Sequence, residues 1–148
     1  MRLVVDASTL VAELLRQRGQ ELLASSQLDL YVPARMWEET SHEVRKRLEI
    51  RVSRGLPERV ANRYWDAAMG LKERRVAEVP EEVYADLKDA ALRRLPRDPN
   101  DWQVAALALS LGAGILTEDG DFFGCGIATW TAGTLIAQLE HRGESPFA

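Results

Sequence analysis

Short apolar runs alternate with longer helix-forming segments along most of the chain. The runs at residues 3–5, 29–32, 76–79, 115–117 and 127–129 are typical of strands. Strands that alternate with helices predict an α/β protein with a mostly parallel sheet, covered by helices and connected by right-handed crossovers. In such sheets ligands bind beyond the carboxyl ends of the strands. Residues that directly follow a strand are therefore the first candidates for function.

Helices are expected at residues 9–15, 34–52, 58–74, 80–92, 101–111 and 131–140. Gly19 is expected to break the first of these helices, before a second turn at residues 21–25. Gly112 is expected to end the helix at 101–111, which is nearly all apolar and should be buried on most sides. The 148 residues, with 46% hydrophobic content, suffice for one core, so we expect a single domain over residues 1–148.

The composition limits the classes of protein and of site. Residues 1–5 reach the carboxylate of Asp6 before the apolar region of a signal peptide can form, and the longest apolar stretch, residues 104–116, is too short to span a membrane. The single cysteine, Cys125, cannot form an internal disulfide, and it excludes a zinc site built from cysteines. We therefore expect a cytoplasmic protein without a membrane partner.

The net charge of −4 argues against a protein that binds nucleic acid mainly by neutralising phosphates with Lys and Arg. A metal-dependent nuclease escapes this objection, because bound cations change the sign of the potential in an acidic pocket. Arg45 and Arg51, in the helix at 34–52, are candidate contacts for an RNA backbone. The alternative for each of them is a solvated helix face.

Acidic residues from separate segments are expected at one edge of the sheet. Asp6 directly follows the first strand. Asp119 and Asp121 follow the strand at 115–117, and Asp101 lies in the first turn of the apolar helix. No matching basic residues are expected at this edge, so the carboxylates would repel one another unless a cation neutralised them. Oxygen ligands favour Mg²⁺ or Mn²⁺, which activate water and orient phosphate, so the cluster indicates hydrolysis of a phosphodiester bond.

Some of the acidic residues have alternatives that the sequence leaves open. Asp98, followed by proline, is typical of a helix N-cap, and Asp119, followed by glycine, is common in turns. Glu38 and Glu39 both lie in the first turns of the helix at 34–52 and flank its apolar stripe. Helical periodicity therefore does not choose between these two glutamates.

Four short motifs of this chain follow one another in a particular order and spacing. They are Val-Val-Asp6-Ala-Ser8, then Pro33 with Glu39 six residues later, then Asp98-Pro-Asn-Asp101-Trp, and finally Leu-Thr117-Glu-Asp119-Gly-Asp121-Phe-Phe. Each motif is weak alone, but the series resembles the PIN domain family, and especially its VapC-type ribonuclease toxins. The resemblance extends over nearly the whole chain, except for an expected helical insert at about residues 57–92.

The resemblance implies a Rossmann-like three-layer α/β/α sandwich and a metal-dependent endoribonuclease. The acids that it implies as catalytic are Asp6, Glu39, Asp101 and Asp119. The ligands that it implies for Mg²⁺ or Mn²⁺ are Asp6, Asp101, Asp119 and Asp121, with Ser8, Asp98 and Thr117 in support. It also implies RNA as substrate, a homodimer and, for VapC-type members, a cognate antitoxin protein. The alternatives are a PIN nuclease of RNA processing and an inactive PIN scaffold that binds protein or RNA.

Other classes of phosphate-handling protein fit the sequence less well. A phosphatase of the haloacid-dehalogenase type would have a second Asp two residues after the first, where this chain has Ser8. A response-regulator receiver would need an acidic pair near the end of its first strand and a downstream Lys, and we find neither. The sequence also contains no Gly-rich Walker loop.

Overall fold

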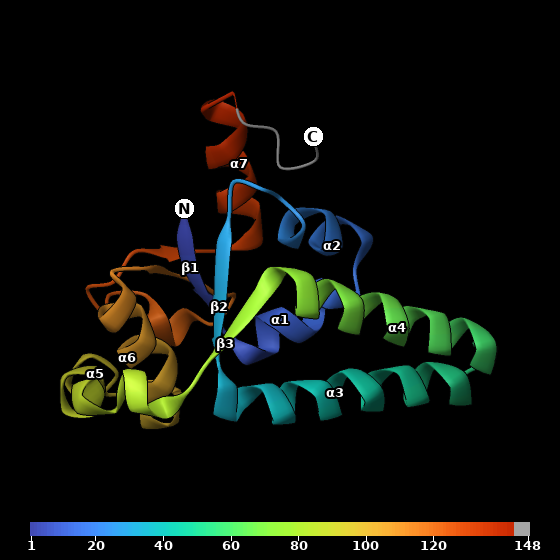
Figure 1. Cartoon of the computed structure of the whole chain (residues 1–148), viewed down its shortest axis with the longest axis horizontal. Coiled ribbons are helices and arrows are strands. Elements are labelled where there is room, and N and C mark those ends of the chain that lie inside the picture. The colour runs from blue at the N-terminus through green and yellow to red at the C-terminus, as the bar shows by residue number, and fades with distance from the viewer. Residues whose placement is uncertain (144–148) are drawn as a thin grey trace.

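The computed structural model describes residues 1–143 and has a parallel β-sheet at its centre (Figure 1). The sheet contains five strands in the order β3-β2-β1-β4-β5, and every neighbouring pair is parallel. The strands are β1 (Arg2–Val5), β2 (Asp29–Pro33), β3 (Val76–Val79), β4 (Gly114–Leu116) and β5 (Thr129–Trp130). The strand order reverses between β1 and β4, and the carboxyl ends at such a point form the usual ligand site.

Helices cover both faces of the sheet. They are α1 (Ala7–Leu14), α2 (Gln17–Leu23), α3 (Ala34–Ser53), α4 (Glu58–Arg75), α5 (Lys88–Arg94), α6 (Trp102–Leu111) and α7 (Ala132–His141). Short 3-10 turns lie at η1 (Glu81–Val83), η2 (Ala85–Leu87), η3 (Pro99–Asp101) and η4 (Gly120–Phe122). Within residues 1–143, none of the helices has both the length and the apolar character that crossing a membrane requires.

Two hydrophobic clusters fill the space on either side of the sheet. Leu3 and Val5 of β1 contribute to the first cluster and Val4 to the second, because successive side chains of a strand point to opposite faces. The first cluster packs the sheet against α1, α2, α3, α4 and α7, and the second packs it against α5 and α6. The expected α/β/α sandwich with a parallel sheet is confirmed.

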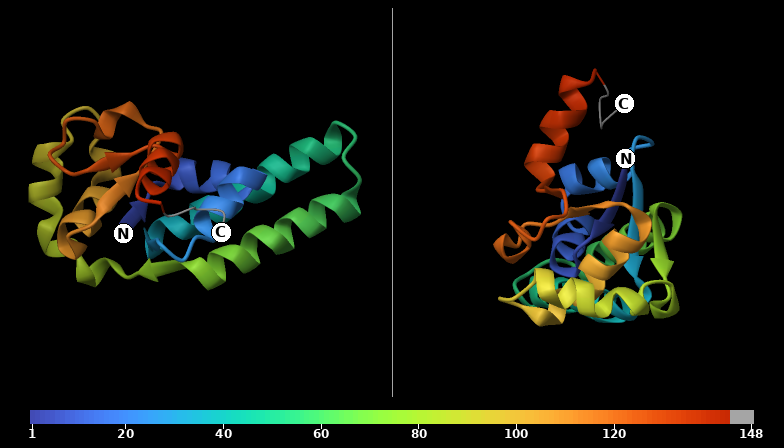
Figure 2. Two further views of the ribbon diagram at one scale, coloured as in Figure 1. Left: turned by 90° about the horizontal axis from the view of Figure 1, so that it is seen from above. Right: turned by 90° about the vertical axis from the view of Figure 1, so that its left-hand side faces the viewer.

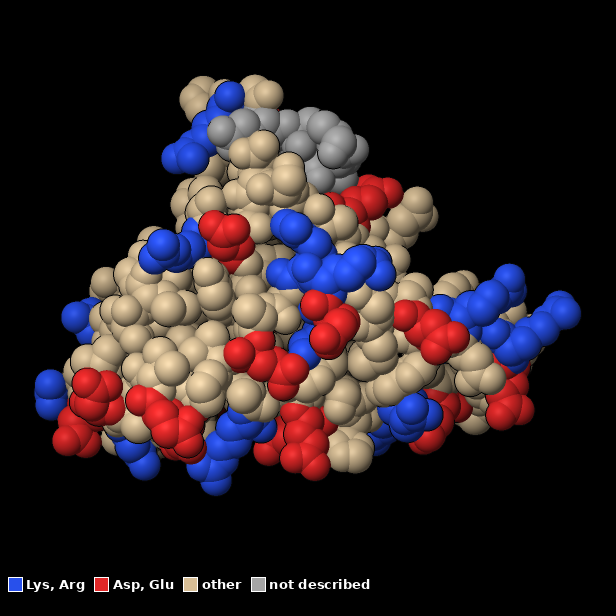
Figure 3. Space-filling model, viewed as in Figure 1, with Lys and Arg blue, Asp and Glu red and all other residues tan. Residues whose placement is uncertain are grey.

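The helices α3 and α4 form a long hairpin that extends away from the sheet (Figure 2). The two helices are joined by a turn in which Gly55 has a φ of 110°, a conformation that favours glycine. On the face drawn in Figure 3, basic and acidic side chains are interspersed over the hairpin and the body of the molecule. The described residues on this face therefore form no continuous basic stripe for a nucleic acid.

The expected break at Gly19 is wrong. Gly19 lies inside α2, and the chain leaves helical structure earlier, between Leu14 and Gln17. A Cβ atom on Gly19 would lie 2.6 Å from the Cα of Glu13 and closer still to its carbonyl oxygen. Glycine is present because α1 and α2 pass so close to each other, and not because a helix has to end.

Two further expectations differ from the structure. Residues 80–92 were expected to form one helix, but η1 and η2 precede α5, which begins only at Lys88. The last strand is Thr129–Trp130, two residues later than the expected start at residue 127. The segment 57–92 contains the edge strand β3 as well as helices. That the chain is a single domain with a helical insert at these residues stays a prediction.

Candidate functional site

Asp6 lies where β1 and β4 end side by side. Val5 is paired with Leu116 in this parallel pair, so Asp6 and Thr117 leave the sheet next to each other. Asp6 is only 4% exposed. Its Oδ2 atom accepts hydrogen bonds from Thr117 Oγ1 at 3.0 Å and from Ser8 Oγ at 3.1 Å. The two hydroxyls hold one carboxylate oxygen at the carboxyl end of β1.

The loop after β4 brings Asp119 and Asp121 to the same edge. The backbone N–H of Asp119 donates to Thr117 Oγ1 at 2.9 Å, so the buried Thr117 hydroxyl contacts both Asp6 and the Asp119 turn. Asp119 is the N-cap of η4, and its Oδ1 atom accepts a hydrogen bond from the backbone N–H of Asp121 at 2.9 Å. Asp119 therefore lies in a turn, as its following glycine suggests, and also at the carboxyl edge of the sheet.

Asp98 and Asp101 flank the turn η3 before α6. Asp98 is the N-cap of this turn and accepts a hydrogen bond from the backbone N–H of Asn100 at 3.0 Å, so its expected capping role is confirmed. Asp101 is the N-cap of α6 but makes no capping bond with its side chain. Within residues 1–143 its Oδ2 atom is buried and has no hydrogen-bond partner. Such an oxygen is costly, which indicates a ligand that satisfies it.

The acidic residues of this edge influence one another electrostatically. Burial is the main cause that raises the pKa of Asp101 from 3.8 to about 7. The charges of four other aspartates raise it further, and these are Asp6, Asp98, Asp119 and Asp121. The aspartates after β1, after β4 and before α6 therefore lie near enough to influence one another, as the sequence predicts, whereas their roles as site residues stay a prediction.

Asp6 is under two opposing influences. Burial raises its pKa, whereas the hydrogen bonds from Thr117 and Ser8 lower it, and the charge of Asp119 raises it again. Hydroxyl donors favour the charged carboxylate because they stabilise its negative charge. Among residues 1–143, hydroxyl donors thus contact the buried carboxylate of Asp6, whereas the buried Oδ2 atom of Asp101 has no donor.

The available donors fit a hard divalent cation. Among residues 1–143, no group of three or more His, Cys, Asp and Glu side chains is close enough to hold an ion by itself. Mg²⁺ does not require such a group, because it keeps several waters and binds through one or two carboxylates. A cation at this edge would relieve both the repulsion among the acids and the unpaired oxygen of Asp101. Within residues 1–143 no three of the predicted ligands Asp6, Asp101, Asp119 and Asp121 can hold one ion directly, so which of them bind a cation stays a prediction.

Glu39 is exposed, and its charge is not among those that raise the pKa of Asp101. Rotation by about 100° per residue places Glu39 on the flank of α3 next to Met36, and Glu38 on the opposite side. Met36 packs against the cluster that also contains Trp102, the neighbour of Asp101. This packing, which the sequence alone does not reveal, favours Glu39 over Glu38 as the glutamate of the predicted site.

Arg45 and Arg51 lie on the outer part of the α3–α4 hairpin. At a rise of 1.5 Å per residue, they are about 17 Å and about 26 Å along α3 from its start. The guanidinium of Arg45 stacks 4.0 Å from the centroid of the Trp65 ring. Arg51, by contrast, lines a hollow between α3 and α4 on one side and the α1–α2 turn on the other. A role for both in RNA binding stays a prediction, and the two would contact RNA at separate places.

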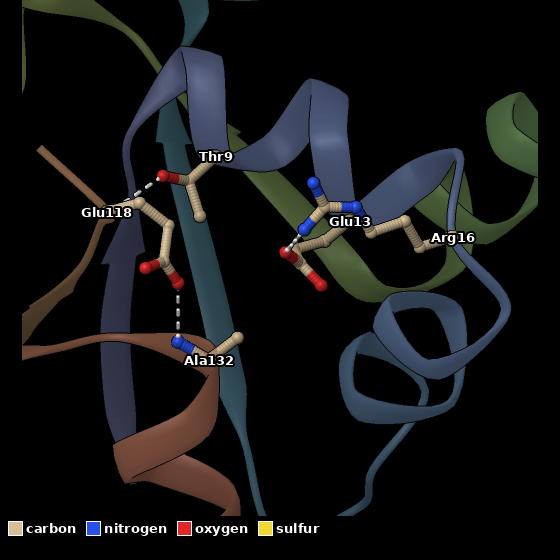
Figure 4. Close-up of polar contacts among 5 residues, drawn as sticks. All are labelled: Thr9, Glu13, Arg16, Glu118 and Ala132. Atoms are coloured by element: carbon tan, nitrogen blue, oxygen red, sulfur yellow. Dashed lines mark hydrogen bonds and ion pairs between the residues drawn. The ribbon is translucent and has the colours of Figure 1, made fainter.

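Two residues that sequence reasoning did not select connect the site to its surroundings (Figure 4). Thr9 Oγ1 accepts a hydrogen bond from the backbone N–H of Glu118 at 3.0 Å, and Glu118 Oε1 accepts one from Ala132 at 2.9 Å. The loop between β4 and Asp119 is thereby attached to α1 and to the start of α7. The position of Thr9 in the first turn of a helix is a sequence signal for a side chain that bonds to nearby backbone. No local pattern of the sequence pairs Glu118 with residue 132.

Thr117→Val is expected to destabilise the protein by about 1.5 kcal/mol, because valine has the same shape but neither donates to Asp6 nor accepts from Asp119. Urea denaturation measures the change in the free energy of unfolding. Ser8→Ala is the matched control, since it removes a single bond to the same oxygen from an exposed side chain. Equal effects of the two substitutions would contradict the central position given to Thr117.

The metal-free protein is expected to lose stability as the pH rises from 5 to 8. The pKa of Asp101 is raised from 3.8 to about 7, so in this range the native state holds a proton that the unfolded state has released. The loss is about 2 kcal/mol for this group, reduced from the full shift because part of the side chain faces solvent. Thermal denaturation in EDTA measures it, and a wild-type stability that does not fall between pH 5 and 8 would contradict it.

Comparison with known proteins identifies the family and the fold. The family model described as "PIN domain" matches residues 4–140. Among solved structures, the chain is similar to a chain of FitAcB from Neisseria gonorrhoeae, with 21% sequence identity and a TM-score of 0.51. The alignment covers 90% of this chain and 99% of that chain, and at this identity it shows the fold alone. No curated protein sequence matches this chain significantly.

Proposed function

Because this chain belongs to the PIN domain family, we propose that it is a nuclease that uses Mg²⁺ or Mn²⁺ to hydrolyse phosphodiester bonds in RNA. Membership of the family supports a nuclease-type, hydrolytic function. The metal dependence and the RNA substrate are our proposals. The observation that carries them is the buried, unpaired oxygen of Asp101 among four other aspartates at the carboxyl edge of the sheet.

The acidic residues at the carboxyl edge of the sheet would have different roles in the proposed reaction. Asp6 is oriented by its two hydroxyl donors, which favour its charged form against the burial that raises its pKa, and Asp119 is fixed through its backbone bond to Thr117. Asp101 presents a buried oxygen, Oδ2, that no donor among residues 1–143 occupies. Together these carboxylates would hold a divalent ion, which would supply polarisation of a phosphate oxygen and a lower pKa for water. Glu39 would face the same edge from α3, and Asp121 would add a further carboxylate to this edge.

The biological setting is also a proposal. The order of the motifs resembles VapC-type toxins, so we propose a toxin that works with a cognate antitoxin protein and forms a homodimer. A PIN nuclease of RNA processing would use the same acids without an antitoxin. An inactive scaffold would keep the fold but would have no need for an unpaired carboxylate, which costs stability. The retained acids favour the two enzymatic alternatives.

A pool of random-sequence, single-stranded RNA tests the reaction without assuming a target. The pool is incubated with the protein and Mg²⁺ or Mn²⁺, and new RNA ends are mapped by sequencing. We expect ends that appear with either metal, disappear in EDTA and disappear in Asp119→Asn. Since water is the nucleophile, the products should carry no 2′,3′-cyclic phosphate. Absence of new ends with the wild type, or cleavage that persists in EDTA, would contradict the proposal.

A further inference from the structure

Phe123 is a large apolar side chain that faces solvent beside the acidic cluster. It is 54% exposed, more than any other large hydrophobic residue among those that the structure describes. It directly follows the buried Phe122 and comes two residues after Asp121. A Cβ atom on Gly120 would lie 3.8 Å from Phe123 Cδ2, so the ring lies over the residue between Asp119 and Asp121. The ring is therefore part of the rim of the acidic site.

The loop that carries this ring is fixed at several points. The backbone N–H of Phe123 donates to the carbonyl of Gly120 at 3.1 Å, and that of Cys125 donates to the carbonyl of Phe122 at 3.3 Å. Phe122 and Cys125 are buried, and Arg94 donates to the carbonyl of Cys125 at 3.0 Å. The backbone thus holds the ring in place, although the ring itself has little packing.

We propose that Phe123 is a stacking platform for an unpaired nucleobase next to the phosphate that the acids hold. This inference rests on the proposed nuclease function and assigns to Phe123 the contact with a base of the substrate. An aromatic ring fixed beside a phosphate site stacks with any base, because every base has a π face. A base inside a duplex has both faces covered by its neighbours, so it cannot use the platform. The exposure of Phe123 leaves its ring free for this contact.

Phe123→Leu keeps an apolar side chain but removes the π face, and Phe123→Trp keeps the face. With a short single-stranded RNA cleaved by the wild type, we expect Phe123→Leu to raise KM about 5- to 100-fold and to leave kcat within about twofold. Phe123→Trp should cleave like the wild type. Val83→Ala is the matched control, because Val83 is 45% exposed and its carbonyl contacts Ser110, near the end of α6 opposite to Asp101. Mn²⁺ affinity should not change in any of these variants.

An RNA that lacks one base, at each position next to the cleaved bond in turn, identifies the stacked base. At one position, loss of the base should raise KM for the wild type. In Phe123→Leu the same abasic RNA should raise KM almost no further, because both changes remove the same contact. The inference would be overturned if the abasic RNA and Phe123→Leu had additive effects on KM at every position, or if the KM of Phe123→Leu were within twofold of that of the wild type. In either case, cleavage by the wild type would still support the nuclease function. A wild type that cleaves no RNA would overturn both.

Discussion

Asp101→Asn is expected to lower the rate of metal-dependent RNA cleavage at least about a thousandfold and, in the same protein without metal, to raise stability at pH 8. The substitution removes an anionic ligand, and a thousandfold loss corresponds to about 4 kcal/mol of activation free energy. It also removes the carboxyl group whose pKa is raised to about 7, and which is therefore charged and poorly solvated at pH 8. Gain of stability with loss of activity is typical of a group retained for function.

Two measurements on the same preparation test this prediction. Cleavage is followed in Mn²⁺, and thermal unfolding is followed in EDTA at pH 5 and pH 8, where the pH-dependent loss of stability of the wild type should be reduced in Asp101→Asn. The control is Asp66→Asn, which neutralises an exposed aspartate on α4. Asp66→Asn should leave both quantities unchanged. An Asp101→Asn variant that cleaves within tenfold of the wild type, or that is less stable at pH 8, would contradict the assignment.

Gly19→Ala is expected to destabilise the protein by about 2 kcal/mol, which corresponds to a fall in Tm of about 4–8 °C for a chain of this size. Alanine is the better helix former by about 1 kcal/mol, so helix propensity alone would predict the opposite sign. The added methyl group, however, would overlap the backbone of Glu13, which cannot rotate away. Glu13 is itself buried and is paired with Arg16 at 3.5 Å, in the corner between α1 and α2 (Figure 4).

Gly133→Ala is the matched control for this prediction. Gly133 also lies in a helix, but it is exposed and the nearest atom to an added Cβ is 3.9 Å away, on Thr131. This substitution should therefore be neutral or slightly stabilising. Equal denaturation midpoints for the two variants would show that the close approach of α1 and α2 is not tight in solution.

The pattern of apolar residues was enough to predict the sheet, because each strand is separated from the next by helix-forming sequence. It was not enough at Gly19, where the reason for glycine is contact with Glu13, six residues earlier along the chain. It was also not enough at residues 80–92, because the pattern of apolar residues does not separate 3-10 turns from an α-helix. In both places a tertiary contact or a local hydrogen-bond choice decided the backbone.

The convergence of Asp6, Asp101 and Asp119 was predictable, since parallel strands end at one edge and these residues follow strands or begin the helix beside them. The hydrogen bonds that support these three aspartates were less predictable from the sequence. Glu118 reaches the start of α7 only because β4, β5 and α7 take particular relative positions. The family resemblance implies Glu39, and the packing of Met36 against the cluster of Trp102 is an argument for it over Glu38 that the sequence pattern could not supply.

Calorimetric titration of Mn²⁺ into the wild type and into Asp6→Asn, at neutral pH, tests most directly whether the acidic edge is a metal site. Each protein is titrated alone and with a short RNA made uncleavable by phosphorothioate linkages. We predict saturable binding to the wild type that is at least tenfold weaker in Asp6→Asn, and unchanged in the control Asp66→Asn. Absence of saturable binding to the wild type under both conditions, or equal binding to Asp6→Asn, would contradict a metal-dependent nuclease site at this edge.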